Sequence, residues 1–113
     1  MMKLPLIGTI TALITPMNED GSIDFTGLKS LIDMQIAGGI TAIVPCGSTG
    51  ESATMTFDEK CSVIQATVEY AAGRVPVIAG TGSNDTAAAI NLTKQAKALG
   101  ADAVLLVSFN NLS

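Results

Sequence analysis

"TAIVPCGSTGESATMTFDE", residues 41–59, passes from an apolar run through a glycine-rich stretch into the start of a helix. Residues 41–46 are apolar and partly β-branched, so they predict a strand. Thr56 and Glu59 have the spacing of a capping box, in which each side chain accepts a hydrogen bond from a backbone N–H at the start of a helix. The inner face of that helix is then Val63, Ile64, Thr67 and Val68. The stretch predicts a strand, a loop and a helix in that order.

The same order continues on both sides of this stretch. Further strands are predicted at residues 8–16, 75–80 and 102–108. Asp24 is the expected cap of a helix that ends at Gly38 and Gly39, and its inner face is Leu28, Leu31, Ile32 and Ile36. A third helix is expected from Thr86 to Leu99, with Asn84 as its candidate cap.

Strands that alternate with helices form parallel sheets through right-handed crossovers, so the fold class is α/β. Two architectures compete: an open doubly wound sheet and a closed (β/α)8 TIM barrel. The barrel needs about 250 residues, whereas this chain of 113 residues carries about three and a half βα units. The pattern alone leaves both architectures open.

Composition excludes several classes of protein. With 48% hydrophobic residues the chain is too apolar for a disordered segment, and a net charge of −4 without a basic stripe argues against nucleic-acid binding. No apolar run reaches the ~20 residues of a membrane span, and the N-terminus does not resemble a signal peptide. Cys46 and Cys61 lack metal-site or disulfide spacing, so we expect no metal and a reducing cytoplasm. The length suits one domain, residues 1–113.

Two of the predicted strands end in glycine- and hydroxyl-rich loops, "GSTGE" at 47–51 and "GTGSND" at 80–85. Ligands of parallel α/β folds bind at the carboxyl ends of strands. Glycines let the backbone approach a ligand, and hydroxyls both donate and accept hydrogen bonds, which suits a small carboxylate or phosphate. The same glycines also suit tight turns without a ligand. The second loop lacks the third glycine of a dinucleotide-binding motif.

"AIVPCGSTGESATMTFDE", residues 42–59, resembles the signature of the dihydrodipicolinate synthase and N-acetylneuraminate lyase family. The matching positions are Ile43, Val44, Gly47, Ser48, Thr49, Gly50, Glu51 and Glu59. "ITALITPMNEDGSID" at 10–24 and "RVPVIAGTGSNDTAAAI" at 74–90 resemble other parts of that family. The resemblance extends to about Ser108, and its details favour the synthase branch over the sugar-acid lyases.

The resemblance implies the N-terminal half of a (β/α)8 barrel and a class I aldolase-type lyase that needs no cofactor. In this family a lysine forms a Schiff base with pyruvate, which then adds to aspartate semialdehyde in lysine and diaminopimelate biosynthesis. Carried over, Thr49 binds the pyruvate carboxylate, Ser48 occupies the proton-relay position, and Gly47 and Gly50 let the loop fold over the carboxylate. A homo-oligomer, the family tetramer, is also implied.

The chain departs from the family near its end. The family's fourth strand runs into Pro-Tyr-Tyr, whereas residues 109–113 read "FNNLS". The lysines and the one tyrosine are expected on helices or before the first strand, away from strand ends: Lys3, Lys29, Lys60, Lys94, Lys97 and Tyr70. We therefore expect a C-terminally truncated chain that is inactive alone and that self-associates through an exposed barrel interior.

Two alternatives and one regulatory feature remain. The chain could be a non-catalytic remnant, or another pyruvate-dependent aldolase of the family acting on a sugar acid. Ser52, Ala53 and Asn84 match positions that line a lysine-feedback site in some members. Phe57, Lys60 and Ala88 stand where sensitive members carry two histidines and a glutamate, so we do not expect feedback inhibition by lysine.

Overall fold

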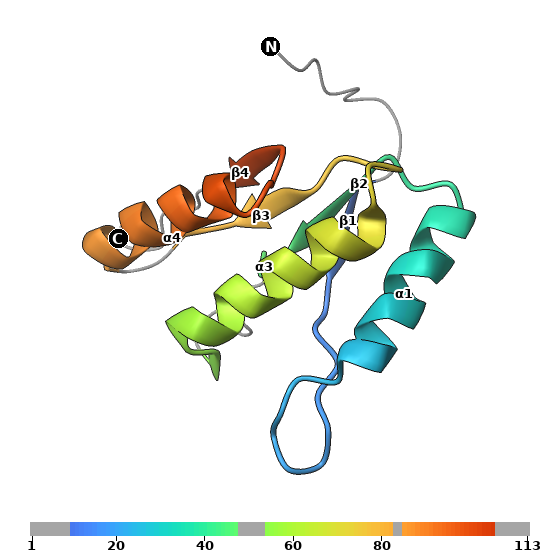
Figure 1. Ribbon diagram of the computed structural model, residues 1–113, viewed down its shortest axis with the longest axis horizontal. Helices are drawn as coiled ribbons and strands as arrows, with labels where there is room; N and C mark the ends of the chain where they lie inside the picture. The colour runs from blue at the N-terminus through green and yellow to red at the C-terminus, as the bar shows by residue number, and fades with distance from the viewer. Residues whose placement is uncertain (1–9, 48–53, 83–84, 106–113) are drawn as a thin grey trace, which may run out of the picture.

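The computed structural model describes residues 10–47, 54–82 and 85–105. Within them strands and helices alternate along the chain (Figure 1). The elements are β1 (Ile10–Leu13), α1 (Phe25–Ala37), β2 (Ala42–Pro45), α3 (Phe57–Ala71), β3 (Ile78–Gly80), α4 (Thr86–Ala98) and β4 (Ala103–Leu105). The order predicted from the sequence is confirmed.

The strands are parallel and follow one another in sequence order. β1 pairs with β2, β3 pairs with β4, and a parallel bridge between Ile43 and Val77 joins the two pairs. Strand residues that lie on one face, such as Leu13, Ile43 and Ala79, share a core with residues of all the described helices. A doubly wound sheet carries helices on both faces. Helices on one face and consecutive parallel strands identify this fold as part of a (β/α) barrel.

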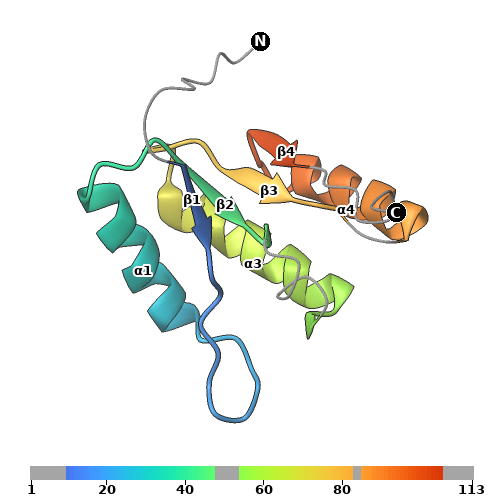
Figure 2. The same ribbon diagram turned by 180° about the vertical axis from the view of Figure 1, so that it is seen from behind.

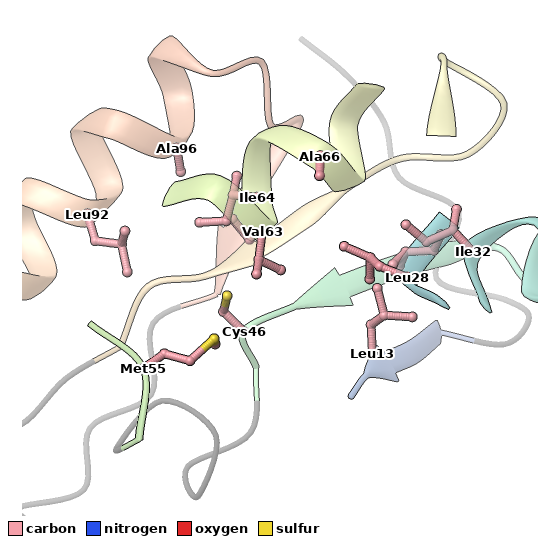
Figure 3. Close-up of a cluster of buried hydrophobic side chains, with 12 residues drawn as sticks. Leu13, Leu28, Ile32, Cys46, Met55, Val63, Ile64, Ala66, Leu92 and Ala96 are labelled. Atoms are coloured by element: carbon pink, nitrogen blue, oxygen red, sulfur yellow. The ribbon is translucent and has the colours of Figure 1, made fainter. Parts of the chain in front are cut away.

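The core lies between the sheet and the helices (Figure 3). Val104 of β4 packs against this core. The core members come from β1, β2, β3, the three helices and the segments beside β2 and α3: Leu13, Leu28, Ile32, Ile43, Cys46, Met55, Val63, Ile64, Ala66, Ala79, Leu92 and Ala96. Leu28 and Ile32 are fully buried, as the helical spacing of the first apolar stripe predicts. The stripes predicted as the inner faces of α1 and α3 therefore contribute to the core.

Among the residues that the structure describes, no helix lies over the opposite face of the sheet (Figure 2). Side chains alternate along a strand, so the residues between the core-facing ones point to this face, which would be the interior of a closed barrel. Ile10 pairs with Ala42 on it, and Leu105 pairs with Gly80. Ile10 is 46% exposed and Leu105 41%. We call this surface the inner face.

Helix caps agree with the sequence at two starts and differ at one. Asp24 accepts from the backbone N–H of Gly27, and Thr56 and Glu59 form both bonds of the capping box. The third helix is capped by Asp85, not by Asn84, because the Asp85 carboxylate accepts from the N–H groups of Ala87 and Ala88.

β3 begins later than predicted, for a reason visible in its hydrogen bonds. The predicted strand included residues 75–77, but Pro76 has no N–H for a ladder, and the Val77 N–H bonds to the Asp102 carboxylate at 2.8 Å. Ordinary pairing therefore starts at Ile78. Within the described ranges, every helix is too short or too polar to span a bilayer.

Candidate functional site

The carboxyl end of β2 turns sharply at Cys46. Its φ of 60° is left-handed, a conformation that non-glycine residues seldom adopt. Strict alternation would point Cys46 to the inner face with Val44, yet its side chain is buried in the core under α3. The Cys46 thiol lies 4.0 Å from the Lys60 carbonyl oxygen and donates to it. The left-handed turn therefore ends β2 at Pro45 and places the Cys46 side chain on the face of the sheet that the helices cover (Figure 3).

The end of β3 lies directly against the backbone of this turn. A Cβ added at Gly80 would lie 2.5 Å from the Cys46 carbonyl oxygen and 2.7 Å from the Gly47 Cα. A Cβ at Gly47 would lie 2.8 Å from Val44 Cγ1. Real Cβ atoms do not make contacts this short. The neighbours of Gly80 are backbone atoms, so position 80 needs glycine, whereas a Cβ at position 47 would require the Val44 side chain to shift. The sequence allowed tight turns without a ligand as the role of the loop glycines, and the close approach at Gly80 agrees with that interpretation.

Thr81, immediately after β3, forms hydrogen bonds with both β4 and α4. Its backbone N–H donates to the Leu105 carbonyl oxygen at 3.0 Å, and its hydroxyl accepts from the Thr93 hydroxyl of α4 at 2.9 Å. Thr81 is fully buried, so this hydroxyl pair satisfies a polar group that water cannot reach. The carboxyl ends of β2, β3 and β4 thus form one connected edge.

Of the residues predicted to bind the keto acid, to relay a proton or to line the effector site, one lies within the described part of the chain. Gly47 is half-buried at the edge just described. The others lie outside the described residues: Ser48, Thr49, Gly50, Glu51, Ser52, Ala53 and Asn84. Their roles stay predictions. The sequence analysis excluded Cys46 from a metal or disulfide site and missed its left-handed backbone, for which the neighbouring Pro45 and Gly47 were the available signal.

The described lysines and the tyrosine lie on helices, as predicted: Lys29, Lys60, Lys94, Lys97 and Tyr70. Lys29 makes an ion pair with Asp33 one turn further along α1. A lysine that forms a Schiff base needs a desolvated position that lowers its pKa, and helix positions at the barrel exterior do not offer one. Lys3 lies outside the described residues.

Of the two cysteines, Cys61 is the less buried. Partial burial, with a smaller effect of the Asp58 carboxylate, raises the pKa of the Cys61 thiol above its ordinary value. A raised pKa keeps the thiol protonated at neutral pH, and a thiol in that form is a poor nucleophile. Cys46 is buried in the core. Neither cysteine has the features of a catalytic thiol.

Comparison with known proteins gives consistent matches over nearly the whole chain. The family model described as "Dihydrodipicolinate synthetase family" matches residues 5–109. The 4-hydroxy-tetrahydrodipicolinate synthase of Ruthia magnifica is 60% identical over 104 residues, which are 92% of this chain and 35% of that protein. The synthase of Gluconacetobacter diazotrophicus is 52% identical over 101 residues, 89% of this chain and 34% of that protein.

Solved structures give the same result. Dihydrodipicolinate synthase from Aquifex aeolicus matches with a TM-score of 0.86 and 50% identity, over 92% of this chain and 36% of that one. The chloride-inhibited dihydrodipicolinate synthase from Acinetobacter baumannii, complexed with pyruvate, matches with a TM-score of 0.87 and 45% identity, over 94% and 37%. The chain thus spans about a third of the length of these relatives.

Proposed function

Because this chain belongs to the dihydrodipicolinate synthetase family, we propose that it forms the keto-acid-binding part of a 4-hydroxy-tetrahydrodipicolinate synthase. Such an enzyme is a lyase that condenses pyruvate with aspartate semialdehyde in lysine and diaminopimelate biosynthesis. The observation that carries the proposal is the turn after β2. Gly47, the first residue of the family's glycine- and hydroxyl-rich motif, follows this turn at the carboxyl edge of a parallel sheet, the edge at which barrel enzymes bind their substrates.

In this proposal the loop after Gly47 binds the negatively charged end of pyruvate. The Thr49 hydroxyl and amide donate hydrogen bonds to the carboxylate, and Gly47 and Gly50 allow the backbone to approach it. Ser48 passes a proton to and from the reacting carbonyl group through its hydroxyl. The complex of the Acinetobacter baumannii relative with pyruvate supports this choice of substrate.

The Schiff-base lysine is not among the described lysines, which all lie on helices. We propose that the rest of the barrel supplies it and that the 113-residue chain alone does not react with pyruvate. Treating the chain with pyruvate and borohydride and then measuring its mass tests this. An unchanged mass is expected, and a reduced pyruvate adduct would show that one of the five lysines is competent.

A chimaera tests the function itself. Residues 5–105 of this chain replace the matching part of the Ruthia magnifica relative, whose remaining length completes the barrel. We expect the chimaera to consume pyruvate in the presence of aspartate semialdehyde. A folded chimaera without this activity would overturn the proposed function.

Two substitutions in the chimaera assign the loop residues. Thr49→Val should raise the KM for pyruvate by about tenfold or more, because it removes a hydrogen bond to a charged group. Ser48→Ala should lower kcat by about 100-fold through loss of proton transfer. Ser30→Ala, at an exposed position of α1, is the matched control and should leave both constants unchanged.

We further propose a cytoplasmic homo-oligomer, the family tetramer, that is insensitive to lysine. Phe57 and Lys60 lie in the first turn of α3, and Ala88 lies in the first turn of α4. These residues replace the side chains that bind the effector in sensitive members, and the Lys60 ammonium would repel that of lysine. Ser52, Ala53 and Asn84 remain the positions proposed to line that site. Inhibition of the chimaera by millimolar lysine would contradict this.

A further inference from the structure

We propose that Gly80 is a positioning residue, whose missing side chain lets the Cys46–Gly47 turn cross the end of β3 and so fixes where the chain leaves the sheet after Gly47. This inference rests on the function proposed above. Gly80 belongs to a different strand from the loop and is separated from Gly47 by α3 and more than thirty residues. It contacts no predicted substrate atom, so its effect on the reaction acts through the backbone of Cys46 and Gly47.

The first step of the argument is where Gly80 lies. Its neighbour Ala79 belongs to the core between sheet and helices, so alternation places Gly80 on the inner face. Gly80 pairs with Leu105, an exposed residue of that same face. The backbone that Gly80 contacts therefore passes over the inner side of the sheet at its carboxyl edge.

The second step is how closely the turn approaches. A Cβ at Gly80 would meet the Cys46 carbonyl oxygen at 2.5 Å, the Cys46 carbonyl carbon at 2.7 Å and the Gly47 Cα at 2.7 Å. Ordinary van der Waals contact begins at 3.4 Å. All three neighbours are backbone atoms, which cannot rotate away as a flexible side chain would. Any side chain at position 80 therefore displaces the turn by a substantial part of an ångström.

The third step is that the turn has little freedom to adapt. The Cys46 side chain is packed in the core with Met55 and Val63, and its thiol donates to the Lys60 carbonyl oxygen (Figure 3). The left-handed φ at Cys46 is what allows this packing together with a turn toward the inner face. The turn is thus held by α3 on one side and by Gly80 on the other. Non-glycine residues in sparsely populated backbone conformations persist where the surrounding structure holds them, and they cluster at catalytic and ligand-binding sites.

Displacement of the turn should weaken pyruvate binding selectively. In the chimaera we expect Gly80→Ala to raise the KM for pyruvate by about tenfold or more, because ångström-scale misplacement of binding groups is costly. The KM for aspartate semialdehyde should change by less than about twofold. Gly38→Ala is the matched control, because a Cβ there lies at least 3.4 Å from its neighbours and the residue follows α1. An unchanged pyruvate KM in a folded Gly80→Ala protein would overturn the inference.

Two substitutions at Cys46 provide a test that does not depend on folding of the Gly80 variant. Cys46→Gly keeps the left-handed φ accessible but removes the packed side chain, whereas Cys46→Val keeps an apolar side chain but disfavours that φ. We expect Cys46→Val to raise the pyruvate KM about tenfold and Cys46→Gly, which loses only the core contact of the turn, to raise it by a smaller factor, even if its thermal midpoint falls further. If the variant with the lower thermal midpoint instead has the higher KM for pyruvate, the turn has only a structural role. If the unsubstituted chimaera is inactive, it is the proposed function that fails.

Discussion

At the scale of single residues, each described helix begins where one side chain accepts hydrogen bonds from the first turn. Asp24, Thr56 and Asp85 fill this position in α1, α3 and α4. The first N–H groups of a helix have no partner within it, so a capping oxygen replaces a bond that would otherwise go to water. Asp85 rather than Asn84 caps α4, although both residue types are good caps. Local composition predicts that a cap exists more reliably than which neighbour provides it.

Thr56 should contribute measurably to stability through the capping box. We expect Thr56→Ala to lower the free energy of unfolding by about 1 kcal/mol, because the Glu59 N–H loses its acceptor at 3.1 Å. Thr56→Ser keeps the hydroxyl and should stay close to the unsubstituted chain. Urea unfolding followed by circular dichroism, at one fixed protein concentration, measures both. Equal losses for alanine and serine would show that the hydroxyl is not the cause.

The Thr81–Thr93 hydroxyl pair should appear as a coupling between β3 and α4. Each single valine substitution leaves one hydroxyl without its partner, so each should cost about 1 kcal/mol or more. The double variant should cost less than the sum of the single variants, because no unpaired hydroxyl remains. A double-mutant cycle in urea measures this coupling. Strictly additive losses would mean that the 2.9 Å contact contributes nothing to stability.

At the scale of elements, α1 and α3 are joined by Arg74. Its guanidinium donates to the Asp33 carboxylate at 2.8 Å and to the Tyr70 carbonyl oxygen at 2.7 Å. It also donates to the Ala71 carbonyl oxygen, so it satisfies the end of α3 while it contacts α1. Arg74, followed by Lys29, holds the pKa of the Asp33 carboxyl below its ordinary value of 3.8.

This pKa shift determines the direction of a pH effect. A carboxyl whose pKa is lowered by folding stabilises the fold above its unfolded pKa and loses that contribution as pH falls through the folded pKa. We therefore expect stability to fall below pH 3.8, with a shallower fall in Asp33→Asn. The pair is exposed, so the difference should be small and should shrink further in high salt. Urea unfolding across this pH range tests it, and an identical pH profile in Asp33→Asn at low salt would contradict it.

At the scale of the whole molecule, the sheet is covered on one face and open on the other among the described residues. The helices pack on the side that carries Leu13 and Ile43, and the other side is left open (Figure 2). This inner face carries the exposed apolar side chains of Ile10 and Leu105. Exposed apolar surface beside strand edges favours association with other chains. This agrees with the self-association expected from the sequence, which remains a prediction.

A charge on the inner face should therefore weaken self-association of the isolated chain. Ile10→Lys should raise its dissociation constant by about tenfold or more, because one large apolar side chain can no longer be buried. Met34→Lys, on the outer side of α1 at 61% exposure, is the matched control and should have little effect. Sedimentation velocity over a range of concentrations measures both. A stable monomer in the unsubstituted chain would contradict the prediction.

What the sequence determined by itself is local. The order of strands and helices, the capping box of Thr56 and Glu59 and the apolar stripe around Leu28 and Ile32 follow from residue types at short spacings, because hydrogen-bonded turns and helical periodicity involve neighbours along the chain. The resemblance of residues 42–59 to a known motif added the family to what the sequence indicates. The pattern of strands and helices alone did not decide between an open doubly wound sheet and a closed barrel.

What only the tertiary structure decided depends on contacts between distant residues. The choice of barrel came from helices lying on one face of the sheet. The left-handed turn at Cys46 depends on packing under α3, and the need for glycine at position 80 depends on backbone from another strand. Arg74 meets Asp33 across 41 residues of sequence. Such contacts arise only when the chain is packed, since they are set by the shape of the core and not by the preferences of any single segment.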